Sequence, residues 1–134
     1  MSDLAEIRDE YEFLEDRDDR YRLIIELGRA LEPMPDALKT PATLVQGCSA
    51  RVWVYPIPTD GKTLHFLADS DSGFTKGVIA LVLKIVQDKT PADIISANIE
   101  DQLAPFNLKN QLSSNRSLGV PNMIALIRET AGRY

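Results

Sequence analysis

The fold is decided by residues 51–87, which read RVWVYPIPTDGKTLHFLADSDSGFTKGVIALVLKIVQ. Apolar and other side chains alternate in two runs of this stretch, and such a period of two is typical of β-strands with one buried face. Between the runs, residues 56–61 contain two prolines and an Asp-Gly pair, which favour a reversal, so we expect an antiparallel hairpin. The inward positions would be Val52, Val54, Leu64, Phe66 and Ala68.

The second half of the stretch changes to a helical period. Apolar residues recur there at i, i+4, i+7, i+8 and i+11, which predicts a helix over about 73–87. The serine-rich segment 69–72 precedes it, and acids just before a helix are ordinarily caps. The apolar positions are Phe74, Val78, Leu81, Val82 and Ile85.

Helices are also expected on both sides of this stretch. Amphipathic patterns predict helices at about 3–15 and 18–31, and Thr90-Pro91 supplies an N-cap and a first-turn proline for a short helix. A last helix is expected to start near Ser114 and to bend where Gly119 and Pro121 occur.

Helices at both ends and strands in the middle indicate an α+β fold. A short strand at 43–45 would bring the antiparallel sheet to about three strands. We therefore predict a two-layer domain in which helices cover one face of this sheet, with residues 1–134 forming a single domain.

Composition excludes several classes of protein. The net charge is −5, with nine acids and four bases in residues 1–22, and no basic stripe suggests a nucleic-acid partner. No apolar run approaches the roughly 18 residues of a membrane span. The acidic N-terminus does not resemble a secretory signal, which favours a cytoplasmic location. One cysteine and one histidine do not suffice for a disulfide or for a metal site with several such ligands.

The single cysteine, Cys48, lies between two strand-like runs and follows Gly47, so we expect a thiol at the tip of a turn. A protruding thiolate can enter a donor's active site and attack the outer sulfur of a persulfide in line. Arg51 is the nearest cation in the sequence to favour the thiolate. The alternative is that Cys48 is a small buried hydrophobic residue.

The segment Leu44-Val45-Gln46-Gly47-Cys48-Ser49-Ala50-Arg51-Val52-Trp53 resembles the cysteine loop of the SufE family of sulfur-acceptor proteins. Two more blocks resemble the same family in the same order. They are Ala68-Asp69-Ser70-Asp71 with Thr75-Lys76-Gly77-Val78-Ile79-Ala80, and Leu112-Ser113 with Asn115-Arg116-Ser117, Gly119 and Met123-Ile124. The likeness runs from about Tyr21 to the last helix.

The resemblance implies that Cys48 carries a persulfide received from a SufS-type cysteine desulfurase. It further implies that the chain activates this enzyme, relays sulfur to a scaffold complex of the SufBCD type for iron–sulfur cluster assembly, and is not a stand-alone enzyme. It would bind no cofactor, since PLP belongs to the desulfurase. The implied fold is similar to that of IscU-type scaffold proteins. A general assembly pathway and a dedicated CsdE-like system remain alternatives.

Other residues are candidates around this cysteine. Gln46 and Gly47 belong to the loop. Arg116 would hold the loop or a persulfide anion by a charge-assisted hydrogen bond, and the alternative is an exposed arginine at the start of a helix. Asp69, Asp71 and Lys76 are candidates for a partner interface, against the alternatives of helix caps and a solvated lysine. His65 and Trp53 fit packing or surface roles better than catalysis.

Two other functions remain alternatives to sulfur transfer. Cys48 could be a redox-sensing thiol that is oxidised to a sulfenic acid. The chain could also be a plain interaction domain with an inert cysteine.

Overall fold

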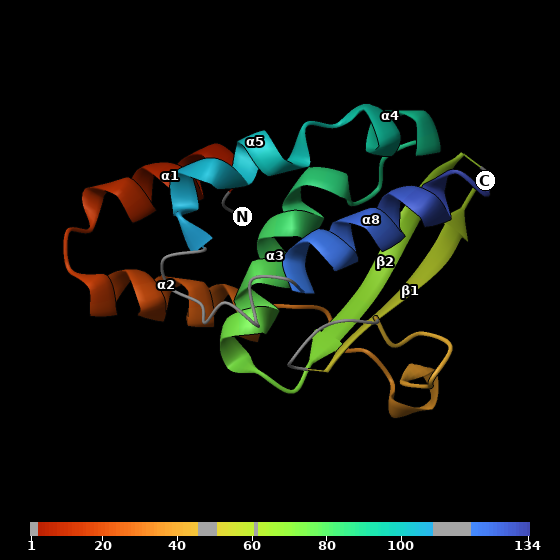
Figure 1. Cartoon of the computed structure of the whole chain (residues 1–134), viewed down its shortest axis with the longest axis horizontal. Helices are drawn as coiled ribbons and strands as arrows, with labels where there is room; N and C mark the ends of the chain where they lie inside the picture. Colours follow the sequence, from red (N-terminus) through yellow and green to blue (C-terminus); the bar gives the residue numbers. More distant parts are fainter. Residues whose placement is uncertain (1–2, 46–50, 61, 109–118) are drawn as a thin grey trace.

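The computed structural model describes residues 3–45, 51–60, 62–108 and 119–134. An antiparallel hairpin of β1 (Val52–Thr59) and β2 (Thr63–Ser70) carries α3 (Gly73–Val86) and α8 (Gly119–Ala131) on one face (Figure 1). The remaining elements are α1 (Leu4–Phe13), α2 (Arg17–Arg29), the 3-10 turns η1 (Asp36–Leu38) and η2 (Ala104–Phe106), α4 (Pro91–Ser96) and α5 (Ile99–Leu103). The predicted two-layer α+β architecture is confirmed.

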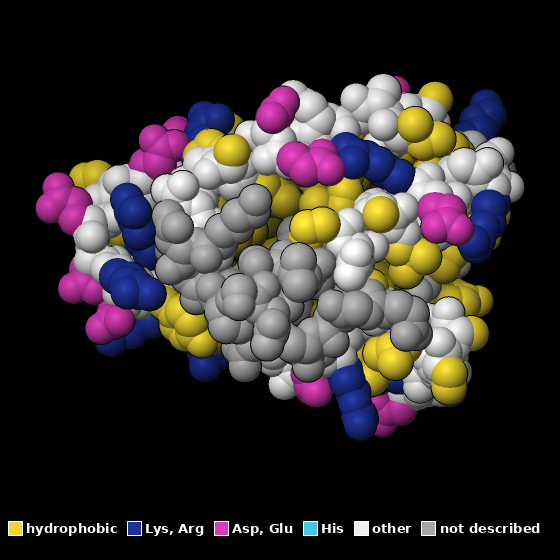
Figure 2. All heavy atoms as spheres, in the orientation of Figure 1, with side chains coloured by type: hydrophobic (Ala, Val, Ile, Leu, Met, Phe, Trp, Pro, Cys, Tyr) yellow, Lys and Arg dark blue, Asp and Glu magenta, His cyan; other side chains and the backbone are white. Residues whose placement is uncertain are grey.

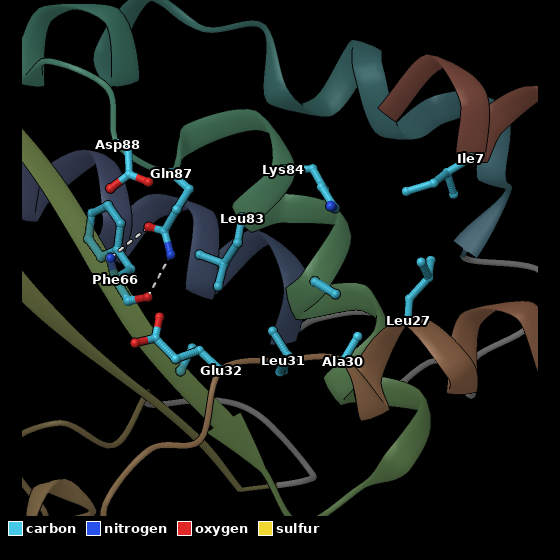
Figure 3. Close-up of a pocket in the computed structure, with 12 residues that line it drawn as sticks. Ile7, Leu27, Ala30, Leu31, Glu32, Phe66, Leu83, Lys84, Gln87 and Asp88 are labelled. Atoms are coloured by element: carbon cyan, nitrogen blue, oxygen red, sulfur yellow. Dashed lines mark hydrogen bonds between the residues drawn. The ribbon is translucent and has the colours of Figure 1, made fainter. Parts of the chain in front are cut away.

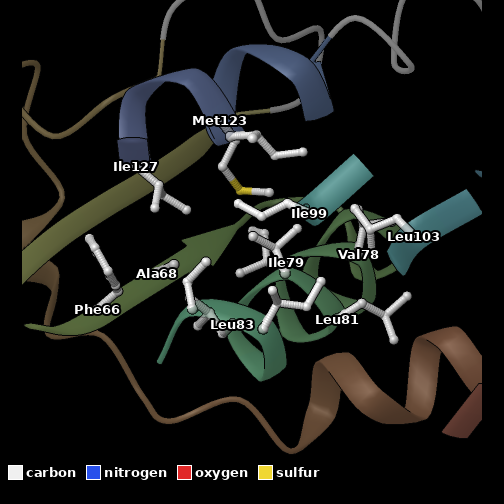
Figure 4. Packing of buried hydrophobic residues seen from close by; sticks show 14 of the residues in the cluster. Phe66, Ala68, Val78, Ile79, Leu81, Leu83, Ile99, Leu103, Met123 and Ile127 are labelled. Atoms are coloured by element: carbon white, nitrogen blue, oxygen red, sulfur yellow. The ribbon is translucent and has the colours of Figure 1, made fainter. Parts of the chain in front are cut away.

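The buried face of the hairpin is the predicted one. Val52, Val54, Leu64, Phe66 and Ala68 are all buried, and they contact one hydrophobic cluster under α3 and α8. Met123 and Ile127 of α8 point toward this layer in Figure 4. Helix α3 is apolar around most of its circumference because α1, α2 and α5 also pack on it.

The predicted third strand is reduced to a short pairing at the edge of β1. Leu44 bridges Trp53, the Val45 amide donates to the Val52 carbonyl over 2.8 Å, and the Val54 amide donates to the Thr43 carbonyl over 3.0 Å. The pairing then stops, and the sheet has two full strands among the residues described.

The prolines lie within β1, not in the reversal where the sequence suggested them. Pro56 pairs with Phe66 and Pro58 with Leu64. The backbone N–H and C=O groups of Phe66 and Leu64 point away from β1, toward Gln87 and residues 88–89. Their partners Pro56 and Pro58 must therefore direct their own backbone groups away from β2, so the proline nitrogens face the outer edge of β1. A proline without an N–H group breaks no hydrogen bond with β2 at these positions. It also prevents another strand from pairing with this part of the edge.

The structure confirms a predicted helix N-cap and the predicted hairpin turn. Thr90 Oγ1 accepts from the Asp93 amide at 3.2 Å, which confirms the N-cap, and Asp60 adopts φ 52° in the hairpin turn. The last helix is described from Gly119, whereas its predicted start near Ser114 falls outside the described residues. No helix in the described parts is long and apolar enough to span a bilayer.

Candidate functional site

The predicted site centres on a segment whose two ends the structure describes. Gln46, Gly47 and Cys48 lie outside the described residues, and so does Arg116. Val45 on one side and Arg51 on the other are described, and the Val45 amide is hydrogen-bonded to the Val52 carbonyl. The chain before the cysteine segment is thus paired with the start of β1, directly after Arg51.

Arg51, the C-terminal flank, is bound to the junction between β2 and α3. Its amide donates to Asp71 Oδ1 over 3.0 Å, and its carbonyl accepts from Ser70 Oγ at 2.6 Å and from the Asp71 amide at 3.3 Å. Both backbone groups of Arg51 are therefore satisfied. Its guanidinium forms no ion pair with any residue in the described part of the chain, so it is available to a negatively charged group nearby.

Asp69 lies at the same junction and binds two lysines. Its carboxylate is 2.7 Å from Lys39 Nζ and 3.3 Å from Lys76 Nζ, and it accepts the Ser70 amide at 2.8 Å. The Asp69 side chain is only 16% exposed. Burial raises its pKa, but the hydrogen bonds from Lys39 and Ser70 and the two ammonium charges outweigh burial and lower the pKa below its ordinary range. Asp69 is an anion at neutral pH.

Lys39 is a site residue that the sequence analysis missed. Its ammonium lies 5.6 Å from the centroid of the Trp53 ring and bridges Asp69 to the exposed Asp36. The hydrogen bond with Asp69 raises the pKa of Lys39. Lys39 and Asp69 are 30 positions apart, and no local pattern connects them, so only the folded chain brings them together.

The capping role expected of Asp69 and Asp71 belongs to Ser72. Ser72 Oγ accepts the Thr75 amide at 3.3 Å and is the N-cap of α3. Asp69 is still in β2, and Asp71 is oriented toward the Arg51 amide. Their carboxylates are engaged within the chain, and Lys76 is engaged with Asp69, so the three candidates for a partner interface first of all join parts of this protein.

A hollow of about 580 Å³ occupies a different part of the molecule (Figure 3). Apolar side chains from α1, α2, α3 and β2 line it, and Glu32, Lys84 and Asp88 lie at its rim. Gln87 closes the β2 edge there, because its amide bonds to both backbone groups of Phe66. None of the predicted site residues is among the described residues that line this hollow.

His65 lies beside the rim of this hollow and has two partners, which the sequence did not reveal. Its Nε2 is 2.6 Å from Glu32 Oε1, and its Nδ1 is 2.8 Å from Asp88 Oδ1. Both contacts are hydrogen bonds only when both ring nitrogens carry protons. Hydrogen bonds to Glu32 and then Asp88 raise the pKa of His65. Its role is electrostatic bridging between β2 and the ends of α2 and α3.

No group of three or more His, Cys, Asp and Glu side chains is placed to hold a metal ion in the ranges the structure describes. The surface in Figure 2 carries acidic and basic side chains side by side near α1 and α2. Helix α2 contains short-range ion pairs, such as Arg22 with Asp19 and Arg29 with Glu26. Such exposed pairs contribute little to stability.

Comparison with known proteins identifies the family. The family model described as "SufE: Fe-S metabolism associated domain" matches residues 5–131. An uncharacterized SufE-like protein of Rhizobium etli is 34% identical over 98% of this chain and 90% of its own length. Another from Rhizobium meliloti is 35% identical over 98% of this chain and 96% of its own. The chain belongs to the SufE family, whose domain is associated with iron–sulfur metabolism.

A solved structure has the same fold. The solution structure of a hypothetical protein from Thermus thermophilus aligns with a TM-score of 0.74 over 97% of this chain and 93% of that one. The sequence identity is 12%, so the likeness concerns the fold alone.

Proposed function

We propose that this protein accepts a sulfur atom on Cys48 from the persulfide of a PLP-dependent cysteine desulfurase and relays it to iron–sulfur cluster assembly. The observation that carries the proposal is the anchoring of the cysteine segment in a member of the SufE family. Val45, which precedes the segment, is hydrogen-bonded to Val52, and Arg51, which follows it, is held by Ser70 and Asp71. A short segment between fixed ends suits a thiol that must enter another protein's active site.

The transfer needs no external oxidant. The Cys48 thiolate attacks the outer sulfur of the donor's persulfide, a new S–S bond forms on Cys48, and the donor's S–S bond breaks. The donor cysteine leaves as a thiolate, and the proton of the persulfide travels with the transferred sulfur. A downstream thiol on a scaffold of the SufBCD type then repeats the exchange with Cys48.

The cations and loop residues singled out in the sequence have distinct proposed roles. The guanidinium of Arg51, which forms no ion pair with a described residue, favours the thiolate form of Cys48, because a nearby positive charge lowers a thiol pKa. Arg116 stabilises the persulfide anion by a charge-assisted hydrogen bond. Gln46 and Gly47 shape the approach to Cys48. Lys76 contributes indirectly, through its ion pair with Asp69.

The test is a desulfurase assay with intact-mass detection. Wild type should stimulate sulfide release from cysteine and gain the mass of one sulfur atom on Cys48, whereas Cys48→Ser should do neither. Arg116→Ala should load more slowly and Arg116→Lys should recover part of the rate. Full stimulation by Cys48→Ser would contradict the proposal, as would a wild-type protein that gains no sulfur.

A further inference from the structure

Lys39 connects the chain that leads into the cysteine segment with strand β2. Its side chain starts directly after η1, extends over the Trp53 ring of β1 and ends 2.7 Å from Asp69 Oδ2 in β2. Trp53 and Asp69 are direct cross-strand partners. The lysine thus reaches across β1 to β2. It is 23% exposed, so water screens the pair less than it screens a surface pair.

The backbone between Lys39 and the cysteine segment is a closed turn. Thr43 Oγ1 donates to the Leu38 carbonyl over 2.6 Å and accepts the Thr40 amide at 3.0 Å. The Leu44 amide donates to the Thr40 carbonyl over 3.1 Å. These bonds connect Leu38 and Thr40, the chain neighbours of Lys39, with Thr43 and Leu44, which precede Val45.

Neighbouring residues bind the chain on both sides of the segment. Asp69 binds Lys39, which lies six positions before Val45, and Ser70 and Asp71 bind Arg51, the C-terminal flank. Ser72 is the N-cap of α3, and Lys76 of that helix is the second cation that contacts Asp69. Residues 69–72 thus contact the chain on both sides of the cysteine segment, at Lys39 and at Arg51.

We propose that Lys39 is a positioning residue for sulfur transfer, which acts through Asp69 by holding the N-terminal flank of the Cys48 segment against the β2–α3 junction. The inference rests on the proposed function, because it takes Cys48 as the sulfur acceptor. Lys39 does not touch the reacting atoms. Its contribution is alignment, and in-line attack on a persulfide is sensitive to displacements of about 1 Å.

The test is a double-mutant cycle on the loading rate. Lys39→Met keeps an apolar stem next to Trp53 and removes the charge, while Lys76 still pairs with Asp69. Lys39→Met and Asp69→Asn should each lower kcat/KM for desulfurase-dependent loading of Cys48 about tenfold or more. The double variant should be no slower than the slower single variant, because both act through one contact. Lys39→Arg should recover most of the rate.

Two further measurements separate positioning from folding. Alkylation of Cys48 by iodoacetamide without the desulfurase, and the unfolding midpoint, should stay near wild type in Lys39→Met. Lys62→Met is the matched control, because Lys62 lies at the opposite end of the same hairpin, and it should load normally.

Three results would each overturn the role of Lys39. Lys39→Met could load sulfur at the wild-type rate, or the rate losses of the two single variants could add up in the double variant. The loss of loading rate in Lys39→Met could also equal the fraction of that variant that is unfolded. In all three cases wild type is loaded, so the sulfur-acceptor function stands. A wild type that gains no sulfur would remove that function and this inference with it.

Discussion

Asp69 and Asp71 are separated by one serine and hold different parts of the chain. Asp69 pairs with Lys39 and Lys76, while Asp71 accepts the amide of Arg51. Local sequence rules assign such acids to the cap of the following helix. At this junction the cap is a serine, which leaves both carboxylates to bind residues that precede them by 20 or 30 positions.

His65 should make the stability of the fold depend on pH. Its folded pKa is raised above the ordinary value of 6.5, first by Glu32 and then by Asp88. Protonated His65 therefore contributes stability that is fully present below about pH 6.5 and is lost as the pH rises through the raised folded pKa. Denaturant unfolding at several pH values should show this decrease, and Glu32→Gln should weaken it.

The chain has one histidine, so its imidazole NMR signal reports the pKa directly. We expect the measured pKa to fall toward 6.5 in Glu32→Gln and in Asp88→Asn. Glu26→Gln, on α2 but paired with Arg29, should leave the pKa unchanged. A wild-type pKa at or below 6.5 would contradict the bridging role.

At the scale of elements, the crossing of α2 and α3 explains two glycines in the family-like part of the sequence. A Cβ on Gly77 would lie 2.0 Å from the Ile24 carbonyl oxygen, and a Cβ on Gly28 would lie 2.7 Å from the Gly77 nitrogen. The two helix backbones are thus nearly in contact. Sequence reasoning recognised the pattern around these glycines but gave no physical reason for it.

We predict that Gly77→Ala destabilises the fold by about 1–3 kcal/mol, because the helices must move apart to admit the methyl group. Gly73→Ala is the control in the same helix, since its Cβ would meet only Ile25 Cδ1 at 3.4 Å. That variant should be neutral or slightly stabilising. Urea unfolding compares the two, and equal midpoints would show that the crossing is not tightly packed.

In the hairpin, the sequence pattern predicted the buried faces of the strands but not the end of β1. Alternation correctly predicted the buried faces of β1 and β2, because strand side chains alternate regardless of neighbours. It placed the end of β1 too early, because Pro56 and Pro58 read as breakers. Whether a proline breaks a strand depends on which edge its nitrogen faces, and that depends on the partner strand.

For the whole molecule, α1 is attached to a distant part of the chain. The Tyr11 hydroxyl donates to the Phe106 carbonyl over 2.6 Å, across 95 positions in sequence, and the two rings pack at 5.1 Å. Arg20 binds the Tyr11 carbonyl at the end of α1 and lies 4.8 Å over the Tyr11 ring. Tyr11 therefore joins α1, α2 and η2.

Tyr11→Phe should lower the free energy of unfolding by about 1–2 kcal/mol, because the buried Phe106 carbonyl loses its hydroxyl donor. Tyr21→Phe, at a half-exposed ring that stacks on Phe74, should cost much less. Guanidinium unfolding measures both, and hydrogen exchange should show faster opening of α1 in the Tyr11 variant. Equal stability of the two variants would mean that this hydrogen bond does not secure α1.

The sequence by itself determined the two full strands with their buried faces, helices α1 to α4 and the family, because periodicity and short motifs are local properties of the chain. It also singled out Cys48, Arg51, Asp69, Asp71 and Lys76. Only the tertiary structure decided how the described residues around the cysteine segment are held: Lys39 joins Asp69, Asp71 joins Arg51, and His65 joins two carboxylates. Such contacts depend on distances between residues far apart in the chain, and these distances exist only once the core has packed.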